Sequence, residues 1–318
     1  MPQHNVALFI TCLTDQFYPH VGVAVTKILE RFDCHVSFPR AQTCCGQPFF
    51  NNGFHDEARE LAKRFVEIFE PFDYVVTPSG SCCAMVREQF HELLKGDHAW
   101  GHGMERVSGR TYEFVEFLDR VLKADLSHLS LPGSEPRPTT YHYTCHLRGI
   151  GIKDQGVKLL RQMGNVDFRA MDKTDQCCGF GGTFAVKYPA ISGAIVEDKV
   201  NCVADTKAQT LVCNDAGCTM NIAGMCHRRG VDVRVKHIAE LMAEAMGIDV
   251  TKWWRRPVEG MPFSHHRSSD NRSGSSASNN RRFVGVRVRA ASVPAAMALG
   301  TATPGGASEA PRVPRAMA

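Results

Sequence analysis

Two short stretches of the sequence place cysteines side by side, each pair followed by glycine: "TCCGQP" at 43–48 and "QCCGFGG" at 176–182. Neighbouring thiols are open to oxidation, but thiolates are also the ligands that soft metal ions and iron–sulfur clusters prefer. Ten of the thirteen cysteines fall into two sets built around these pairs. The candidate cofactor ligands are Cys12, Cys44, Cys45, Cys82 and Cys83 in the first set, and Cys145, Cys177, Cys178, Cys213 and Cys218 in the second.

The two sets repeat one another at an offset of 133 residues. Their intervals are C-x31-CC-x36-CC and C-x31-CC-x34-C-x4-C. The stretch "LFITCLTDQ" aligns with "YHYTCHLRG", which matches Cys12 with Cys145, and Cys82 matches Cys218 after three inserted residues. Three landmarks in one order predict two copies of one fold, produced by a duplication.

Five thiols in each set favour a polynuclear centre. A structural zinc ion takes four ligands, and two adjacent cysteines rarely aim both sulfurs at one ion. In an iron–sulfur cluster neighbouring sulfurs can bind different irons. Gly46 and the glycines at 179–182 are expected to adopt positive φ and to turn backbone N–H groups toward sulfur. A zinc site, buried structural cysteines and a vicinal disulfide remain the alternatives.

Each set needs a frame, and apolar strands alternate with amphipathic helices around both. This rhythm predicts an α/β protein of two homologous repeats, each a parallel sheet flanked by helices. The cysteines follow predicted strands, and open α/β sheets bind ligands at the carboxyl ends of their strands. The predicted strands are 6–10, 34–39, 74–78, 139–144, 166–171 and 210–214, and the predicted helices are 21–31, 55–69, 154–163 and 189–206.

The expected domains are a first cysteine-rich repeat at 1–126 and a second at 139–256, joined by a Pro, Gly and Ser-rich linker at 127–138. Residues 257–318 have a low-complexity composition that predicts a disordered basic tail. From Lys252 onward eleven Lys and Arg face three Asp and Glu, so the net charge of +4 belongs to this tail. The body is weakly acidic, and no nucleic-acid partner is expected.

The N-terminus "MPQHNVALFITC" lacks the basic region and the length of a signal peptide. No stretch approaches the roughly 18 apolar residues of a transmembrane helix. The sequence therefore predicts a cytoplasmic protein without a transmembrane segment. In that reducing compartment dense cysteine usage favours metal binding or thiol chemistry.

The pattern of both sets resembles the CCG cysteine-rich domain of heterodisulfide reductase B and of glycolate oxidase iron–sulfur proteins. The stretches "VALFITC", "FPRAQTCCGQPFFNNG" and "YVVTPSGSC" resemble the lactate utilization protein A family most closely. The resemblance covers about residues 5–250. It implies an iron–sulfur electron-transfer subunit, holding [4Fe–4S] or non-cubane clusters, in a complex that oxidises L-lactate to pyruvate. The implied partners are a ferredoxin-type iron–sulfur protein and a third subunit.

The chain departs from the C-x-x-C ending of that family pattern. Thr77 stands at the position of Cys213, Ser79 stands where the first cysteine of C-x-x-C belongs, and Cys83 follows Cys82 directly. The second set keeps more of the motif, so the first is expected to hold a different cluster, or none. Two other functions stay open: a thiol–disulfide reductase component like heterodisulfide reductase B, and a zinc-stabilised scaffold. Whether the chain is an enzyme by itself is also open.

The remaining cysteines match no position of the repeat. Cys34, Cys202 and Cys226 are predicted to be small buried apolar residues. The large apolar residues of the long helices recur at helical spacing and are predicted to form core, as in the group Phe65, Ile68 and Phe69.

Polar residues next to the second set have two interpretations. His142, His146 and Arg148 flank Cys145 and either contact a cluster or an anionic substrate, or are ordinary hydrogen-bonding residues. Asp215 is predicted to be a turn residue or helix cap. The "GFGG" run lacks the strand, helix and downstream acidic residue of a dinucleotide fingerprint, so no NAD site is expected.

Overall fold

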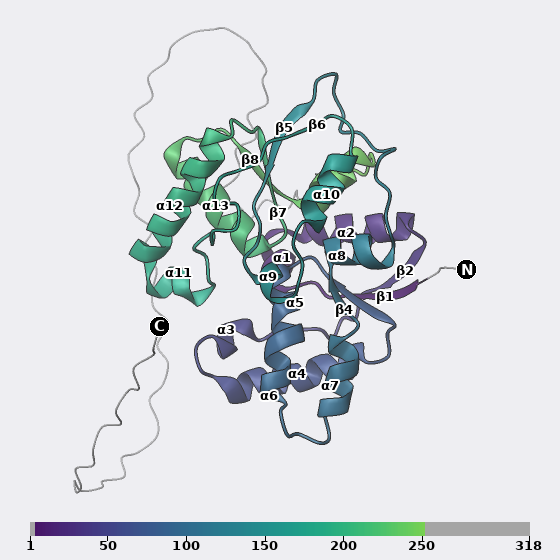
Figure 1. Ribbon diagram of the computed structural model, residues 1–318. Coiled ribbons are helices and arrows are strands. Elements are labelled where there is room, and N and C mark those ends of the chain that lie inside the picture. Colours follow the sequence, from purple (N-terminus) through teal and green to yellow (C-terminus); the bar gives the residue numbers. More distant parts are fainter. Residues whose placement is uncertain (1–3, 252–318) are drawn as a thin grey trace, which may run out of the picture. The chain divides into compact units, whose positions relative to one another are not determined.

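The structure, a computed structural model, describes residues 4–251 of the 318-residue chain (Figure 1). The described residues lie in one compact unit. The tail predicted at 257–318 lies outside the described residues. Among the described helices none is both long and apolar enough to cross a membrane.

Each repeat forms a four-stranded parallel sheet with the same strand order. The first sheet has the order β2-β1-β3-β4 and the second β6-β5-β7-β8. All six strand pairings are parallel, with registers such as Val6 opposite Tyr74 and Thr139 opposite Thr210. The prediction of two homologous α/β repeats is confirmed. The strands are β1 His4–Leu8, β2 Cys34–Ser37, β3 Tyr74–Thr77, β4 Thr111–Glu113, β5 Arg137–Tyr141, β6 Val166–Phe168, β7 Thr210–Cys213 and β8 Arg234–His237.

Helices connect consecutive strands in both repeats, as parallel pairing requires. Those of the first repeat are α1 Cys12–Phe17, α2 Pro19–Arg31, α3 Gln47–Phe50, α4 His55–Phe69, α5 Gly80–Ala84, the π-helical turn η1 Met85–Gln89, α6 Phe90–Leu93, α7 Gly101–Ser108, α8 Phe114–Glu116 and η2 Phe117–Val121. Those of the second are α9 His146–Gly149, α10 Gln155–Gln162, α11 Thr183–Lys187, α12 Pro189–Asp205, α13 Ala216–Arg229 and α14 Ile238–Ala245.

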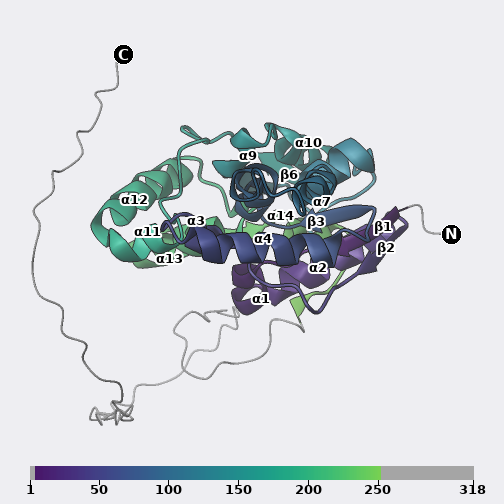
Figure 2. The same cartoon turned by 90° about the horizontal axis from the view of Figure 1, so that it is seen from below.

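The long helices form where the sequence has apolar residues at helical spacing. In α4 the buried side chains of Ala58, Ala62, Phe65 and Phe69 recur every three or four residues, which places them on one face. The predicted core role of Phe65 and Phe69 is confirmed, and Ile68 is a partly buried neighbour of the same cluster. Figure 2 shows α4 running along one side of the first repeat.

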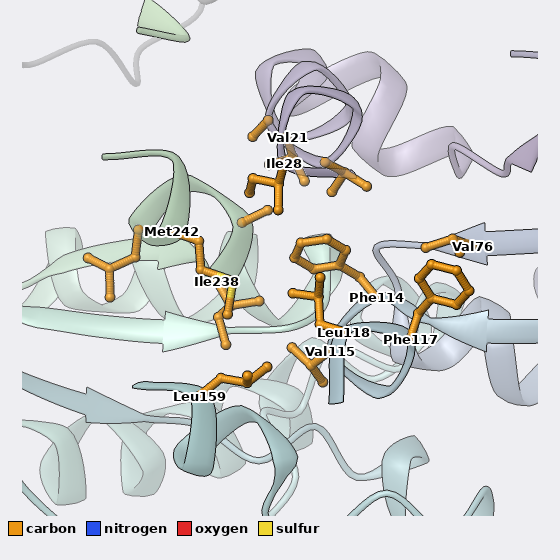
Figure 3. Packing of buried hydrophobic residues seen from close by; sticks show 14 of the residues in the cluster. Val21, Ile28, Val76, Phe114, Val115, Phe117, Leu118, Leu159, Ile238 and Met242 are labelled. Carbon is orange, nitrogen blue, oxygen red and sulfur yellow. The ribbon is translucent and has the colours of Figure 1, made fainter. Parts of the chain in front are cut away.

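The two repeats share a hydrophobic core. Helix α14 packs against α2, and α10 packs against α8, so helices of both repeats meet on one face of each sheet. Figure 3 shows Ile28 of α2, Phe114 and Leu118 near the end of the first repeat, and Leu159 and Met242 of the second directed toward one cluster. This packing brings the strand ends of the repeats close together.

The segment predicted as a linker is attached to the second repeat. The backbone N–H of Leu131 donates to the carbonyl of Gly164 at 3.0 Å, and the Leu131 side chain lies in the shared core. The domain boundaries at 126 and 139 remain a prediction.

The structure differs from the predicted elements mainly at their ends. Strands β1 and β5 end before Cys12 and Cys145, which therefore lie in helical turns. Strands β4 and β8 were not predicted from the sequence. With three residues ("TYE") and four residues, they are too short to show a clear alternation of apolar and polar side chains.

Candidate metal centres at the junction of the repeats

Four thiols of the first repeat converge where α1, the loop before α3, and α5 meet. The Sγ atoms of Cys45 and Cys82 are 3.3 Å apart, and those of Cys12 and Cys44 are 3.6 Å apart. A contact between the thiols of Cys44 and Cys45 joins the two pairs. The Cys45–Cys82 pair is buried, Cys44 is half-buried and Cys12 is exposed.

Four thiols of the second repeat form the same arrangement. The Sγ atoms of Cys178 and Cys218 are 3.1 Å apart and both residues are buried. Cys145 and Cys177 form the outer pair, which is half-buried and joined to the inner pair through Cys177 and Cys178. Equivalent positions thus carry the inner and outer sulfurs of both sets.

These sulfurs are close enough to share metal ions. Two thiolates bound to one ion at about 2.3 Å each lie at most about 4.6 Å apart. All thirteen cysteines are free thiols. Within each pair the two sulfurs are therefore close enough to bind one metal atom, and thiolates are ligands that suit zinc and iron–sulfur clusters.

The glycine after each pair adopts the conformation that the sequence predicts. Gly46 has φ +82° and Gly179 has φ +79°. Their backbone N–H groups donate to the Sγ atoms of Cys44 at 3.5 Å and Cys177 at 3.3 Å. A Cβ atom on Gly179 would lie 2.7 Å from the carbonyl oxygen of Ser192, so a side chain is excluded there by packing as well as by φ.

Hydrogen-bond donors favour the thiolate, the form that binds metals, at one outer sulfur of each set, while the hydrogen bond to that sulfur raises the pKa of its outer partner, Cys12 or Cys145. Hydrogen bonds from Cys12 and Cys45, aided by the N–H of Gly46, lower the pKa of Cys44 to about 3. In the second set hydrogen bonds from Cys145 and Cys178, with the N–H of Gly179, lower the pKa of Cys177 to about 2.

The fifth predicted thiol of each set lies apart from these contacts. Cys83 is fully buried in the core shared by the repeats, beside the Arg87 guanidinium, whereas Cys82 lies in the cluster on the other face of the sheet. Cys213 is buried in the same cluster as Cys218, and its thiol is hydrogen-bonded to Thr219. A ligand role for Cys83 and Cys213 stays a prediction.

Asp215 connects the two repeats. It is the N-cap of α13, where its Oδ1 accepts from the N–H of Gly217 at 3.0 Å, so its predicted role as a cap is confirmed. Its Oδ2 accepts from the hydroxyl of Ser79 at 2.9 Å, and from the hydroxyl and N–H of Ser81 at 2.7 and 3.1 Å. The Ser79 hydroxyl in turn accepts from the N–H of Cys82. Both caps occupy the position of the missing first cysteine of C-x-x-C. Ser79 was noted at this position from the sequence, but its role as a cap and the contact of Ser81 were not predicted.

A second connection runs through His146. Its Nδ1 lies 3.7 Å from the Cys145 Sγ, and its Nε2 lies 3.4 Å from the Nε2 of Gln47, which donates to the carbonyl of Ser81 at 3.3 Å. Helix α5 contacts α9, and α1 contacts α13. Figure 1 shows α1, α5 and α9 close together near the centre of the molecule. The two thiol sets therefore lie along the junction of the repeats.

The other predicted residues have distinct settings. Cys34, Cys202 and Cys226 are buried, as expected for small apolar residues. Arg148 forms an exposed ion pair with Asp175 at 3.4 Å. His142 is fully buried, and its ligand nitrogen and the Sγ atoms of Cys178 and Cys218 lie within 4.8 Å of one another.

Comparisons with known proteins agree with this arrangement. The CCG family, described as "Cysteine-rich domain", matches residues 6–87 and 139–223. Lactate utilization protein A of Geobacillus thermodenitrificans is 44% identical over 239 residues, which cover 75% of this chain and 98% of that protein. Lactate utilization protein A 2 of Bacillus cereus strain Q1 is 40% identical over 243 residues, covering 76% and 99%.

Among solved structures, a glutamate racemase from Francisella tularensis covers 77% of this chain and 80% of its own with a TM-score of 0.30 and 11% identity. A similarity that weak carries no argument about fold or function. The sequence relatives and the matched CCG domains decide the assignment: this chain belongs to the lactate utilization protein A family and has two CCG cysteine-rich domains.

Proposed function

We propose that this chain is the iron–sulfur electron-transfer subunit of a system that oxidises L-lactate to pyruvate. The observation that carries the proposal is the pair of equivalent four-thiol sets at the junction of the repeats. Sequence relatives named for lactate utilization supply the metabolic context. The proposed ligands are Cys12, Cys44, Cys45 and Cys82 in one centre, and Cys145, Cys177, Cys178 and Cys218 in the other.

A bound cluster supplies one-electron redox chemistry, and the chain sets its potential through ligation, hydrogen bonds and burial. The buried inner pairs shield one side of each centre from water, and the N–H groups of Gly46 and Gly179 stabilise negative charge on the outer sulfurs. Cys12 is exposed, so electrons can reach the first centre from the surface.

The link between the sets supports transfer from one centre to the other. Asp215 accepts hydrogen bonds from Ser81, which precedes Cys82, and from Gly217, which precedes Cys218. One carboxylate therefore joins residues adjacent to both centres. In this proposal companion proteins, a ferredoxin-type iron–sulfur protein and a third subunit, exchange electrons with the centres.

Anaerobic purification of the full chain tests the proposal. We expect a brown protein with iron and acid-labile sulfide, an EPR signal that changes when dithionite is added, and reduction by lactate in the presence of the companion proteins. A colourless protein with stoichiometric zinc and no iron would instead identify a zinc-stabilised scaffold. Iron and sulfide without reduction by lactate would retain the cofactor and reject the substrate.

A further inference from the structure

His142 distinguishes the second thiol set from the first. The residue follows β5, and its backbone N–H donates to the carbonyl of Val212 at 2.9 Å. At the equivalent place after β1 the N–H of Phe9 donates to Val76, also at 2.9 Å. The same backbone position thus presents an imidazole in the second repeat and a phenyl ring in the first.

The imidazole of His142 has no hydrogen-bond partner among the described residues. Its exposed fraction is 0%, and both ring nitrogens are buried without a partner. A buried polar group is nearly always paired, so an unpaired one requires an explanation such as a missing ligand. A neutral imidazole has a ring nitrogen with a free lone pair that can bind a metal.

The inner thiols of the second set lie close to the ring of His142. One nitrogen of His142 and the Sγ atoms of Cys178 and Cys218 lie within 4.8 Å of one another, and all three residues are buried. This is the only such group of three metal-binding side chains found among residues 4–251. Two thiolates and one imidazole are a common ligand combination for transition metals.

In the first repeat the apolar side chain of Phe9 stands at the equivalent position. The ring of Phe9 packs edge-on against Phe65 at 5.0 Å and Phe69 at 5.5 Å between centroids. Because a phenyl ring offers no lone pair, the Cys45–Cys82 pair has no nitrogen ligand from this direction.

We propose that His142 binds the metal atom shared by Cys178 and Cys218, so that the second centre has mixed thiolate and imidazole ligation while the first is ligated by thiolates alone. The inference rests on the proposed iron–sulfur function. His142 adds to the second centre a neutral nitrogen ligand that the first centre lacks. Because the ligands of a cluster help to set its reduction potential, the two centres would then differ in potential.

Pulsed EPR of the reduced full-length protein tests this inference without any mutation. Labelling histidine alone with ¹⁵N should change a strongly coupled nitrogen signal from one of two centres. In His142→Phe, which copies the first repeat, this signal should be lost and the potential of one centre should change, while the other centre keeps its spectrum. His91→Phe is the control, because it removes an exposed imidazole that lies outside both thiol sets and is hydrogen-bonded to Ser108.

The outcomes separate the two proposals. A protein with iron and sulfide but no strongly coupled histidine nitrogen would overturn the role of His142 and leave the proposed function intact. A strong coupling that persists in His142→Phe would also overturn it, even if that variant loads less metal. A protein without iron and sulfide would reject the proposed function first.

Discussion

The two repeats have the same strand order and the same four thiols, but equivalent cap positions have become complementary. Ser79 and Asp215 both precede a helix that carries an inner cysteine, yet the serine donates its hydroxyl across the junction to the aspartate. Glu113 and His237 both cap the helix after the last strand of their sheet. These differences lie at the contact between the repeats, which indicates that the duplicated halves have diverged as partners.

The caps after the last strands reach across the junction in both directions. The Oε1 of Glu113 accepts from the Nδ2 of Asn214 at 3.1 Å, and the Nε2 of His237 donates to the carbonyl of Pro78 at 3.1 Å. Pro78 and Asn214 are themselves equivalent positions that follow β3 and β7. Each repeat therefore completes its hydrogen bonds with the other, and the thiol sets are held against one another by the same contacts.

The largest expected effect comes from removing one inner thiol. Cys178→Ser should lose or convert the second centre and keep the first, because the two sets share no cysteine. Cys45→Ser should do the reverse. Iron content and EPR spectra of the anaerobic proteins measure both effects. Cys202→Ser is the control, since this thiol is buried and lies outside both sets.

The outcome decides whether the repeats are two sites or one. Loss of the same EPR signal in Cys178→Ser and Cys45→Ser would show a single centre bridging the junction. An equal loss in Cys202→Ser would show that the eight thiols were sorted wrongly.

Removing the carboxylate of Asp215 should have the next largest effect. Asp215→Ala leaves the hydroxyls of Ser79 and Ser81 and the N–H groups of Ser81 and Gly217 without their acceptor. A buried donor that loses its partner costs roughly 1–3 kcal/mol, so we expect the free energy of unfolding to fall by at least about 3 kcal/mol. Chemical denaturation measures this change.

Asp232→Ala is the matched control, because Asp232 is an exposed residue in the turn before β8. Its effect should stay within about 0.5 kcal/mol. A loss of less than about 1 kcal/mol in Asp215→Ala would show that water replaces the carboxylate and that the junction does not depend on it.

The sequence predicted most of the strands and helices whose residue pattern is local to the element itself. Strands such as Tyr74–Thr77 and helices such as His55–Phe69 carry apolar residues at the period of their own element. The caps at Glu113 and His237 were not predicted, because their partners lie about 100 or more residues away in the other repeat. Contacts of that kind depend on how the two sheets pack.

The thiol spacing likewise predicted which segments bring their cysteines together, but it did not predict toward which face of the sheet each thiol is directed. Cys82 and Cys83 are consecutive residues of α5, and consecutive helical residues point about 100° apart because a turn holds 3.6 residues. Only Cys82 contacts Cys45, while Cys83 faces the core shared by the repeats. Spacing predicts both residues as ligands and carries no information about the direction of a side chain, so the ligand role of Cys83 stays a prediction.

The last comparison concerns the two equivalent caps, whose effect on stability is at most about 1.4 kcal/mol for each pH unit. Burial raises the pKa of Glu113 to about 8 from an ordinary value of 4.5, so between these values the folded state binds a proton that the unfolded state releases. This group therefore makes stability fall as pH rises from 4.5 to 8, by at most about 1.4 kcal/mol per pH unit. Glu113→Gln, a neutral side chain of the same shape, should remove that slope.

His237 should act in the opposite direction. Burial lowers its pKa to about 4 from 6.5, and its Nδ1 must stay unprotonated to accept from the N–H of Ala239 at 3.1 Å. The unfolded state then binds the extra proton, so this group makes stability rise as pH increases from 4 to 6.5. Relative to wild type, His237→Asn should gain stability as pH falls through that window, whereas Glu113→Gln should gain it as pH rises from 4.5 to 8.

Above pH 6.5 only the Glu113 slope remains, so denaturation at pH 6.5, 7.25 and 8 isolates it from that of His237. Since these caps occupy equivalent places, equal slopes in the two variants would mean that the junction is wet enough to leave both groups near their ordinary pKa values. Opposite slopes would show that duplication placed an acid and a base in equally dry positions, where each group pairs with the other repeat in its neutral form.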